Sequence, residues 1–318
     1  MSAARRTHAA RHRPRSAVAL AGLAAVAAGV ALSGCASPAS DRPLIAVTTN
    51  ILGDVVGELV GDQAEVMTLM PPNADPHSFE VSAREAAQLA DAQLLVSNGL
   101  GLEEGVQRHV DAAAAGGVPA VAAGDLIDPV SYVDEDAGEV DDPHLWTDPL
   151  VMIEVVDGLA EAIGREVDGL DADRLEAAAA AYRAELEQLD ADLETQFAGI
   201  PDDRRSLVTN HHVFGYLAER YDFEVVGAVV PSGTTLAAPS ASDLDGLATA
   251  IREAGVPAIF VDSSQPARLA EVLAAEAGVD VEIIGLFTES LSGPDEEAST
   301  YLDMMRSNGE RITAALGR

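Results

Sequence analysis

The stretch DADRLEAAAAAYRAELEQLDADLETQFAG, residues 171–199, decides the fold of this 318-residue chain. Apolar residues recur in it at helical spacing among many Ala, Glu and Asp, which predicts one amphipathic helix. At about 1.5 Å per residue, some 25 helical residues span roughly 38 Å, about the size of a whole lobe. We therefore expect a rigid spacer with a folded lobe on either side. The apolar positions are Leu175, Tyr182, Leu186, Leu189, Leu193 and Phe197.

Both ends of this helix carry boundary signals. Asp173, with Glu176 three residues later, is typical of an N-terminal capping pair. Gly199 followed by Pro201 is typical of a C-terminal stop. The spacer is therefore expected within residues 171–200.

Short β-branched runs alternate with helical stretches on both sides of the spacer. This alternation is the pattern of a parallel sheet with crossover helices. The predicted class is α/β, with two similar lobes, each on a mostly parallel four-stranded sheet, joined by one long rigid helix with a cleft between them. Strands are expected near 44–48, 64–70, 93–97, 118–122, 206–210, 223–229, 258–262 and 281–287, and helices near 51–60, 82–91, 102–115, 149–167, 212–220, 241–254, 266–277 and 297–315.

The first 34 residues have the pattern of an export signal. A basic segment with five Arg precedes the apolar run Ala17 to Leu32, which is short for a membrane span. The run ends in Leu-Ser-Gly-Cys at 32–35, similar to the lipobox of bacterial lipoproteins, in which cleavage precedes a Cys that is then lipidated. Cys35 is the one Cys of the chain, so its use as an anchor leaves no disulfide and no thiolate ligand. The alternative is that Cys35 is an incidental residue of a membrane anchor.

The charge of the chain restricts its partners. The formal net charge is −34, and all 19 basic residues are Arg; without residues 1–34 it becomes −39, from 53 acids against 14 Arg. Such acidity argues against nucleic acid or anionic lipid as a partner and fits attraction of cations, although solubility would explain it equally well. We expect an extracytoplasmic, membrane-tethered monomer. Its predicted segments are a signal (1–34), a lipidated Cys with a tether (35–43), an N-terminal lobe (44–170), the spacer (171–200) and a C-terminal lobe (201–318).

The stretch DDPHLWTDP, residues 141–149, holds a histidine between two prolines just before a helix. Asp148 followed by Pro149 is a strong helix start, because Asp accepts free N–H groups of the first turn and Pro fits the first helical position. His144 is therefore held in a loop with little freedom. A lone loop histidine is usually a solvated side chain, so its meaning depends on other residues.

Three more ligand-type residues lie where a site is expected. Ligands of open α/β sheets bind at the carboxyl ends of the strands. His77 follows the second predicted strand, His211 follows the 206–210 strand, and Glu289 follows the last strand. With His144, these side chains give two ligands from each lobe, which would converge on the cleft.

Three imidazoles and one carboxylate favour a transition metal. Neutral imidazole nitrogen suits Zn²⁺, and four N/O ligands at about 2.0–2.2 Å make its preferred tetrahedron. A site of hard oxygens alone would suit Ca²⁺ or Mg²⁺ instead. The sequence therefore predicts a Zn²⁺ site.

Two of the histidines have alternative interpretations. His77 could cap the helix that begins near Val81. His212 competes with its neighbour His211, although a helix starting there would turn the two side chains in different directions. His109, within a predicted helix, is expected to be a surface residue.

The carboxylates have alternatives as well. Glu289 could be a charge at a helix N-terminus or a solvated loop acid, and Asp262 at another strand end is a rival. The acidic segment 134–142 could gather cations near the cleft, but we expect a solvated acidic loop.

The chain resembles the metal-binding subgroup of solute-binding lipoproteins that serve ABC importers of zinc or manganese. The resemblance implies two α/β lobes joined by one long helix, with a buried metal between them. It also implies an ABC permease with its ATPase as partner and attachment to the membrane through lipid on Cys35; whether a metallochaperone loads the site stays open. The matching segments are DPHSFE with His77, NGLGLE at 98–103, DPHLWTDP with His144, HHVFGYLAERY with His211, TES with Glu289 and YLDMMRSN at 301–308.

The resemblance places the family ligands on His77, His144, His211 and Glu289. Zinc binders of the family resemble this chain, with His three residues before the aromatic of the FGY segment, whereas manganese binders carry Glu there. His211 therefore favours Zn²⁺, with Mn²⁺ as second choice. The fourth ligand is commonly Asp, so the longer Glu289 leaves mono- or bidentate binding open. Many zinc members also have a His-rich loop before the second ligand; here that loop is acidic, so metal collection by histidines is not expected.

Three classes of function compete. The leading hypothesis is a protein that captures Zn²⁺ outside the cell and delivers it to a permease. A secreted zinc hydrolase would keep one metal position open for water, whereas four protein ligands close the site, and the chain has no HExxH and no GxSxG. We therefore do not expect an enzyme. A surface adhesin is the third class, supported by surface tethering alone.

Overall fold

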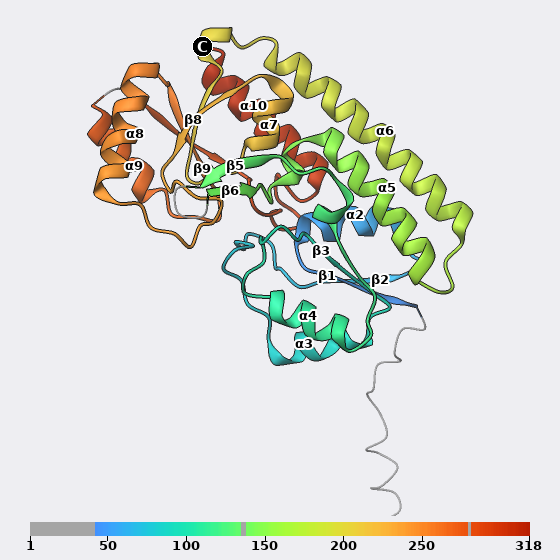
Figure 1. Ribbon diagram of the computed structural model, residues 1–318. Helices are drawn as coiled ribbons and strands as arrows, with labels where there is room; N and C mark the ends of the chain where they lie inside the picture. The colour runs from blue at the N-terminus through green and yellow to red at the C-terminus, as the bar shows by residue number, and fades with distance from the viewer. Residues whose placement is uncertain (1–41, 135–137, 279–280) are drawn as a thin grey trace, which may run out of the picture. The chain divides into compact units, whose positions relative to one another are not determined.

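Two parallel four-stranded sheets carry the fold, one in each half of the chain (Figure 1). Their strand orders are β2–β1–β3–β4 and β10–β9–β7–β8, so in each half the first strand lies between the second and the third. This shared order confirms the predicted α/β class with two similar lobes. The strands are β1 (Leu44–Val47), β2 (Glu65–Thr68), β3 (Leu94–Ser97), β4 (Ala120–Ala122), β7 (Ser206–Thr209), β8 (Glu224–Ala228), β9 (Ala258–Asp262) and β10 (Glu282–Leu286).

The computed structural model describes residues 42–134, 138–278 and 281–318. The predicted export signal, its apolar run and Cys35 lie outside these residues. Within them, no helix combines the length and apolarity that crossing a membrane requires.

The predicted spacer is α6 (Ala172–Phe197), a helix of 26 residues that spans about 39 Å. All six apolar positions expected to face the lobes are buried. They pack against α2 (Asn50–Val60), α5 (Pro149–Glu166) and α10 (Tyr301–Leu316). The helix therefore contacts elements of both lobes along its length.

The N-terminal cap of α6 differs from the prediction. The Asp171 carboxylate accepts hydrogen bonds from the backbone N–H groups of Asp173 and Arg174, so Asp171 is the cap. Asp173 lies inside the first turn, where its negative charge interacts favourably with the positive end of the helix dipole.

One hydrophobic core continues from the first lobe along α6 into the second. It joins Ile45 of β1, Tyr182 of α6 and Phe260 of β9. The opposite face of each sheet has its own smaller core, beneath α4 (Gln107–Ala115) in the first lobe and beneath α8 and α9 in the second. Residues 42–318 form one compact unit, so the boundaries between lobes and spacer stay a prediction.

The remaining helices lie close to their predicted places, and the largest difference is a late start. The helix expected over 102–115 begins at Gln107, because residues 98–103 form a loop in which Gly99, Leu100 and Gly101 all have positive φ. Such backbone suits glycine and does not continue into a helix. The other helices are α3 (Ala83–Gln88), α7 (Gly215–Tyr221), α8 (Ala241–Ala254) and α9 (Arg268–Ala277).

The acidic segment expected as a loop forms in part an antiparallel hairpin. Strands β5 (Ser131–Asp134) and β6 (Gly138–Asp141) pair with Tyr132 opposite Val140; residues 135–137 lie outside the described part. Tyr and Val favour strand, and here they outweigh the acidic neighbours. The hairpin ends at Asp141, and the next residue, Asp142, is completely buried and therefore not a solvated loop acid.

Candidate metal centre

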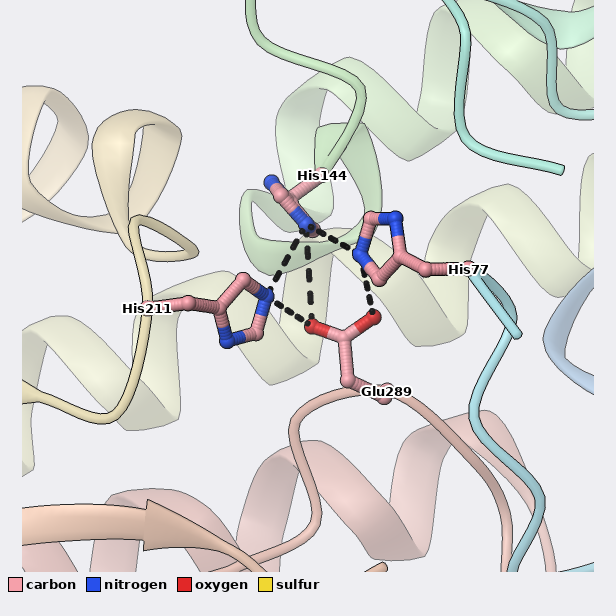
Figure 2. Close-up of side chains that lie close together, drawn as sticks. All are labelled: His77, His144, His211 and Glu289. Atoms are coloured by element: carbon pink, nitrogen blue, oxygen red, sulfur yellow. Dashed lines mark hydrogen bonds and ion pairs between the residues drawn. The ribbon is translucent and has the colours of Figure 1, made fainter. Parts of the chain in front are cut away.

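His77, His144, His211 and Glu289 point their side chains at one another in the interior (Figure 2). Each is at most 1% exposed. His77 comes from the loop after β2, His144 from the turn after the hairpin, His211 from the end of β7 and Glu289 from the loop after β10. The structure thus brings together all four residues singled out in the sequence.

The distances among the four side chains have the size of a tetrahedral metal site. His211 Nε2 lies 3.0 Å from Glu289 Oε1, and His144 Nε2 lies 3.4 Å from the Nε2 atoms of His77 and His211. His77 Nε2 and His144 Nε2 each lie 3.6 Å from a Glu289 oxygen. Four ligands at about 2.0–2.1 Å from a central ion would be about 3.3 Å apart. The set therefore fits one small cation.

Burial holds the three imidazoles in the form that binds metal. It lowers the pKa of His77 to about 2, with help from neighbouring His144 and His211, and the pKa of His211 to about 4. It also lowers the pKa of His144 well below its usual value. The histidines are therefore neutral at pH 7 and offer lone pairs.

Glu289 is the least satisfied group of the cluster. Neither of its oxygens receives a well-directed hydrogen bond, although the side chain is fully buried. Burial, together with the carboxylates of Asp262, Asp75 and Asp142, raises the pKa of Glu289 well above its usual value. A buried acceptor without a donor is costly, and a cation at this point would remove the cost.

Two identical Asp-Pro-His turns present the first two histidines. Asp75 Oδ1 accepts the backbone N–H of His77 at 2.9 Å, and Asp142 Oδ1 accepts that of His144 at 3.0 Å. This is the Asx-turn geometry, in which an Asp side chain accepts from the backbone two residues on. The Pro between Asp and His fixes φ and stiffens each turn.

Asp142 also orients the ring of His144. The Nδ1–H of His144 donates to Asp142 Oδ1 at 2.6 Å. This bond fixes the proton on Nδ1, so Nε2 keeps its lone pair toward the cluster, and a carboxylate partner makes the imidazole a stronger ligand. Asp142 is thus a positioning residue that the sequence reasoning grouped with the solvated acidic loop.

The NGLGLE segment supports the same turn from the other side. The buried Glu103 carboxylate accepts the backbone N–H groups of Asn98 and Gly99, at 2.7 and 3.2 Å. The Asn98 amide then donates to the carbonyl of Pro143 at 2.9 Å. This motif therefore positions the His144 turn.

The loop that carries Glu289 is held from both lobes. Asp262 accepts the backbone N–H groups of Thr288 and Glu289, at 3.0 and 3.1 Å. From the first lobe, Asn50 accepts the N–H of Leu291 at 2.9 Å and donates to Ser290 at 2.7 Å. These bonds hold the Glu289 loop in place without the help of a metal ion.

The alternatives weighed in the sequence take other roles. The cap of α3 is Ser82, so His77 does not cap that helix. His212 stacks on Tyr132 with ring centroids 4.2 Å apart, outside the cluster. Asp262 holds the Glu289 loop rather than replacing Glu289, and His109 lies on α4, where Arg108 donates to it.

We expect Asp142→Asn to weaken Zn²⁺ binding by about 10–100-fold while the fold persists, because the amide accepts less strongly from His144 Nδ1. Competition titration with a zinc chelator measures the change. Asp141→Asn, at the neighbouring exposed acid, is the matched control and should leave affinity unchanged. Equal effects of the two substitutions would mean that general charge, not the bond to His144, is responsible.

Comparisons with known proteins agree with this geometry. The sequence profile of a family described as "Zinc-uptake complex component A periplasmic" (ZnuA) matches residues 45–315. The zinc-binding protein TroA of Treponema pallidum is 31% identical over 284 residues, which cover 88% of this chain and 91% of TroA. The manganese ABC transporter substrate-binding lipoprotein PsaA of Streptococcus pneumoniae is 26% identical over 291 residues, covering 90% and 93%. A solved structure of periplasmic zinc-binding TroA superposes with a TM-score of 0.80 at 30% identity, covering 87% of this chain and all of that one.

Proposed function

The chain belongs to the ZnuA family of periplasmic zinc-uptake components, and we propose that it captures Zn²⁺ outside the cytoplasm and delivers it to an ABC importer. The proposal rests on one observation, the four buried side chains whose ligand atoms all lie within 4.8 Å of one another. His77, His144, His211 and Glu289 are the proposed ligands. The metal is cargo, so the partners are the ion, a permease and the ATPase that drives it.

The donor set supports zinc over manganese as cargo. Three neutral imidazoles and one carboxylate in a tetrahedron match Zn²⁺, whereas Mn²⁺ prefers more oxygen ligands and an octahedron. Relatives named for zinc and for manganese are both similar to this chain, so Mn²⁺ is the alternative cargo. His211 supports Zn²⁺ as the proposed cargo, because this ligand position holds an imidazole and not a carboxylate.

We propose that the mature protein is a monomer tethered by lipid on Cys35, with residues 36–43 as a flexible link. Support comes from the lipobox-like sequence at 32–35 and from the relative that is named a lipoprotein. A single buried site within one chain needs no second copy. The segments proposed from the sequence, 44–170, 171–200 and 201–318, then form the part that carries cargo.

The role of the site in transport argues against catalysis. Four protein ligands close a tetrahedral ion, and a hydrolase needs an open position for water. The family is one of transport components.

Metal content and competitive binding of Zn²⁺ and Mn²⁺ test the proposal. The soluble fragment that begins after Cys35 is purified without an affinity His-tag, stripped of metal and titrated. We expect one tightly held Zn²⁺ per chain that Mn²⁺ does not displace. Preference for Mn²⁺ would overturn the choice of cargo, and absence of any tight metal would overturn the assignment of the four ligands.

A further inference from the structure

The two Asp-Pro-His turns use their aspartates differently. Asp142 Oδ1 accepts from both the backbone N–H and the ring Nδ1–H of His144. Asp75 instead turns its second oxygen away from His77. Asp75 Oδ2 accepts from Thr235 Oγ1 at 2.6 Å and from Gln265 Nε2 at 2.9 Å, both in the C-terminal lobe.

These two donors come from loops that border the cluster. Thr235 lies in the loop between β8 and α8, and Gln265 in the loop between β9 and α9. Both line a cavity of about 110 Å³ that His211 also lines. The bonds to Asp75 therefore join the first lobe to two loops that line this cavity.

The layer that carries these loops is packed apart from the main core. Helices α8 and α9 cover the outer face of the second sheet with their own hydrophobic cluster, which does not include α6 or the first lobe (Figure 1). Hydrogen bonds connect this layer to the first lobe. Two go to Asp75, and another runs from the N–H of Gly233 to the hydroxyl of Tyr132 at 2.9 Å. Hydrogen bonds open more readily than a shared core, so movement is expected where they lie.

Asp75 is well placed to control that movement. It is 8% exposed, so water competes weakly for its bonds. Donation to a carboxylate gives stronger hydrogen bonds than neutral pairs give. The same side chain sets the His77 turn, and it thereby connects a proposed ligand of one lobe to two loops of the other.

We propose that Asp75 is a positioning residue that latches the His77 turn to the C-terminal lobe and sets the rate at which the metal enters and leaves. This inference rests on the proposed function. Thr235 and Gln265 bond to Asp75 and, through these bonds, to none of the four proposed ligand side chains, so the latch acts on the opening of the loops and not on the ligand set. Its loss speeds entry and exit together and leaves the equilibrium affinity nearly unchanged. Loss of a ligand instead raises the exit rate and weakens affinity.

The test removes the two donors and keeps Asp75. The double variant Thr235→Val with Gln265→Met is near-isosteric and leaves the Asp75 bond to the His77 backbone. Stopped-flow mixing with Zn²⁺ and with a chelator gives both rates. We expect each rate to rise by roughly tenfold or more, since hydrogen bonds to a charged group are lost, with the dissociation constant changed by less than about threefold.

Ser78→Ala is the matched control, because Ser78 Oγ donates to the same Asp75 oxygen at 3.0 Å but lies in the same turn. It should leave both rates at the wild-type value. Unchanged rates in the double variant, an equal effect of Ser78→Ala, or a rise of the exit rate alone would overturn the latch.

Amide hydrogen exchange of the metal-stripped protein separates this inference from the proposed function. Residues 229–240 should exchange faster in the double variant than in wild type or Ser78→Ala. If the wild-type chain bound no metal tightly, the proposed cargo would be overturned. The comparison of exchange rates would still test whether the bonds to Asp75 hold the loops closed. Equal exchange in all three proteins would overturn the latch by itself.

Discussion

Replacing His144 with Ala is expected to lower Zn²⁺ affinity by more than about 100-fold, which exceeds the effect of removing a partner that only orients a ligand. The substitution deletes the ligand whose Nε2 lies within 3.4–3.6 Å of the other three ligand side chains. It also leaves the buried Asp142 carboxylate without its ring donor. Chelator competition on metal-stripped protein measures the affinity, and far-UV circular dichroism follows the fold.

His109→Ala is the matched control, because it removes an imidazole that lies on α4 outside the cluster. It should bind Zn²⁺ as wild type does. Near-wild-type affinity in His144→Ala with an intact fold would remove His144 from the proposed site.

Replacing Glu289 with Gln is expected to stabilise the metal-stripped protein at neutral pH and to abolish tight Zn²⁺ binding. An unsatisfied buried polar group costs about 1–3 kcal/mol, and more when it is charged. Each kcal/mol corresponds to about 2–4 °C in Tm for a protein somewhat smaller than this one. Gln fills the same space without the charge, so Tm should rise while the large Tm increase on adding Zn²⁺ to wild type should disappear.

The stabilisation should depend on pH with a defined sign. Burial raises the pKa of Glu289 above the 4.5 of an unperturbed Glu, so the folded chain holds this proton more strongly than the unfolded chain. The carboxylate therefore lowers the free energy of unfolding progressively as the pH rises above about 4.5, until the pH passes the pKa of Glu289 in the folded chain. The difference in Tm between Glu289→Gln and wild type should be small near pH 5 and large near pH 7.5.

Thermal unfolding at the two pH values checks this result, with the exposed Glu271→Gln on α9 as control for the loss of one charge. A Tm difference that is the same at both pH values, or that Glu271→Gln reproduces, would show that global charge rather than burial of Glu289 is responsible.

Most of the fold follows from local sequence signals. The apolar spacing of residues 175–197 predicts α6, and Asp148 with Pro149 predicts the start of α5, which the Asp148 side chain caps as expected. Continuous apolar runs such as residues 258–261 of β9 are buried, as a strand covered on both faces requires. The sequence does not predict the β5–β6 hairpin, because the acidic composition of residues 134–142 masks the strand preference of a few residues there.

The four proposed ligands could be found from the sequence because each is a residue type that binds metals and lies next to the end of a predicted strand or helix. Their supporting residues could not be found in the same way. Asp142 lies among other acidic residues in the sequence, and what sets it apart is its contact with the ring of His144, which is visible in the structure alone. The repeated Asp-Pro-His sequence was the available signal, since it predicts an Asx turn at each copy.

Contacts across the lobes depend on tertiary structure. Nothing local in the sequence pairs Asp75 with Thr235, or Asn50 with Ser290, since these partners are 160 and 240 residues apart. These residues come into contact because the folded chain places the loops of the second sheet beside those of the first.

The continuous core along α6 has a consequence for the resistance of the folded protein to proteolysis. Because one set of apolar side chains stabilises both lobes, a lobe that opened alone would expose the surface on which the other depends. Unfolding is therefore expected to be cooperative across residues 42–318, without a half-folded species that proteases could cut. The separately packed α8–α9 layer is the exception, and the first proteolytic nick of the folded protein should fall there.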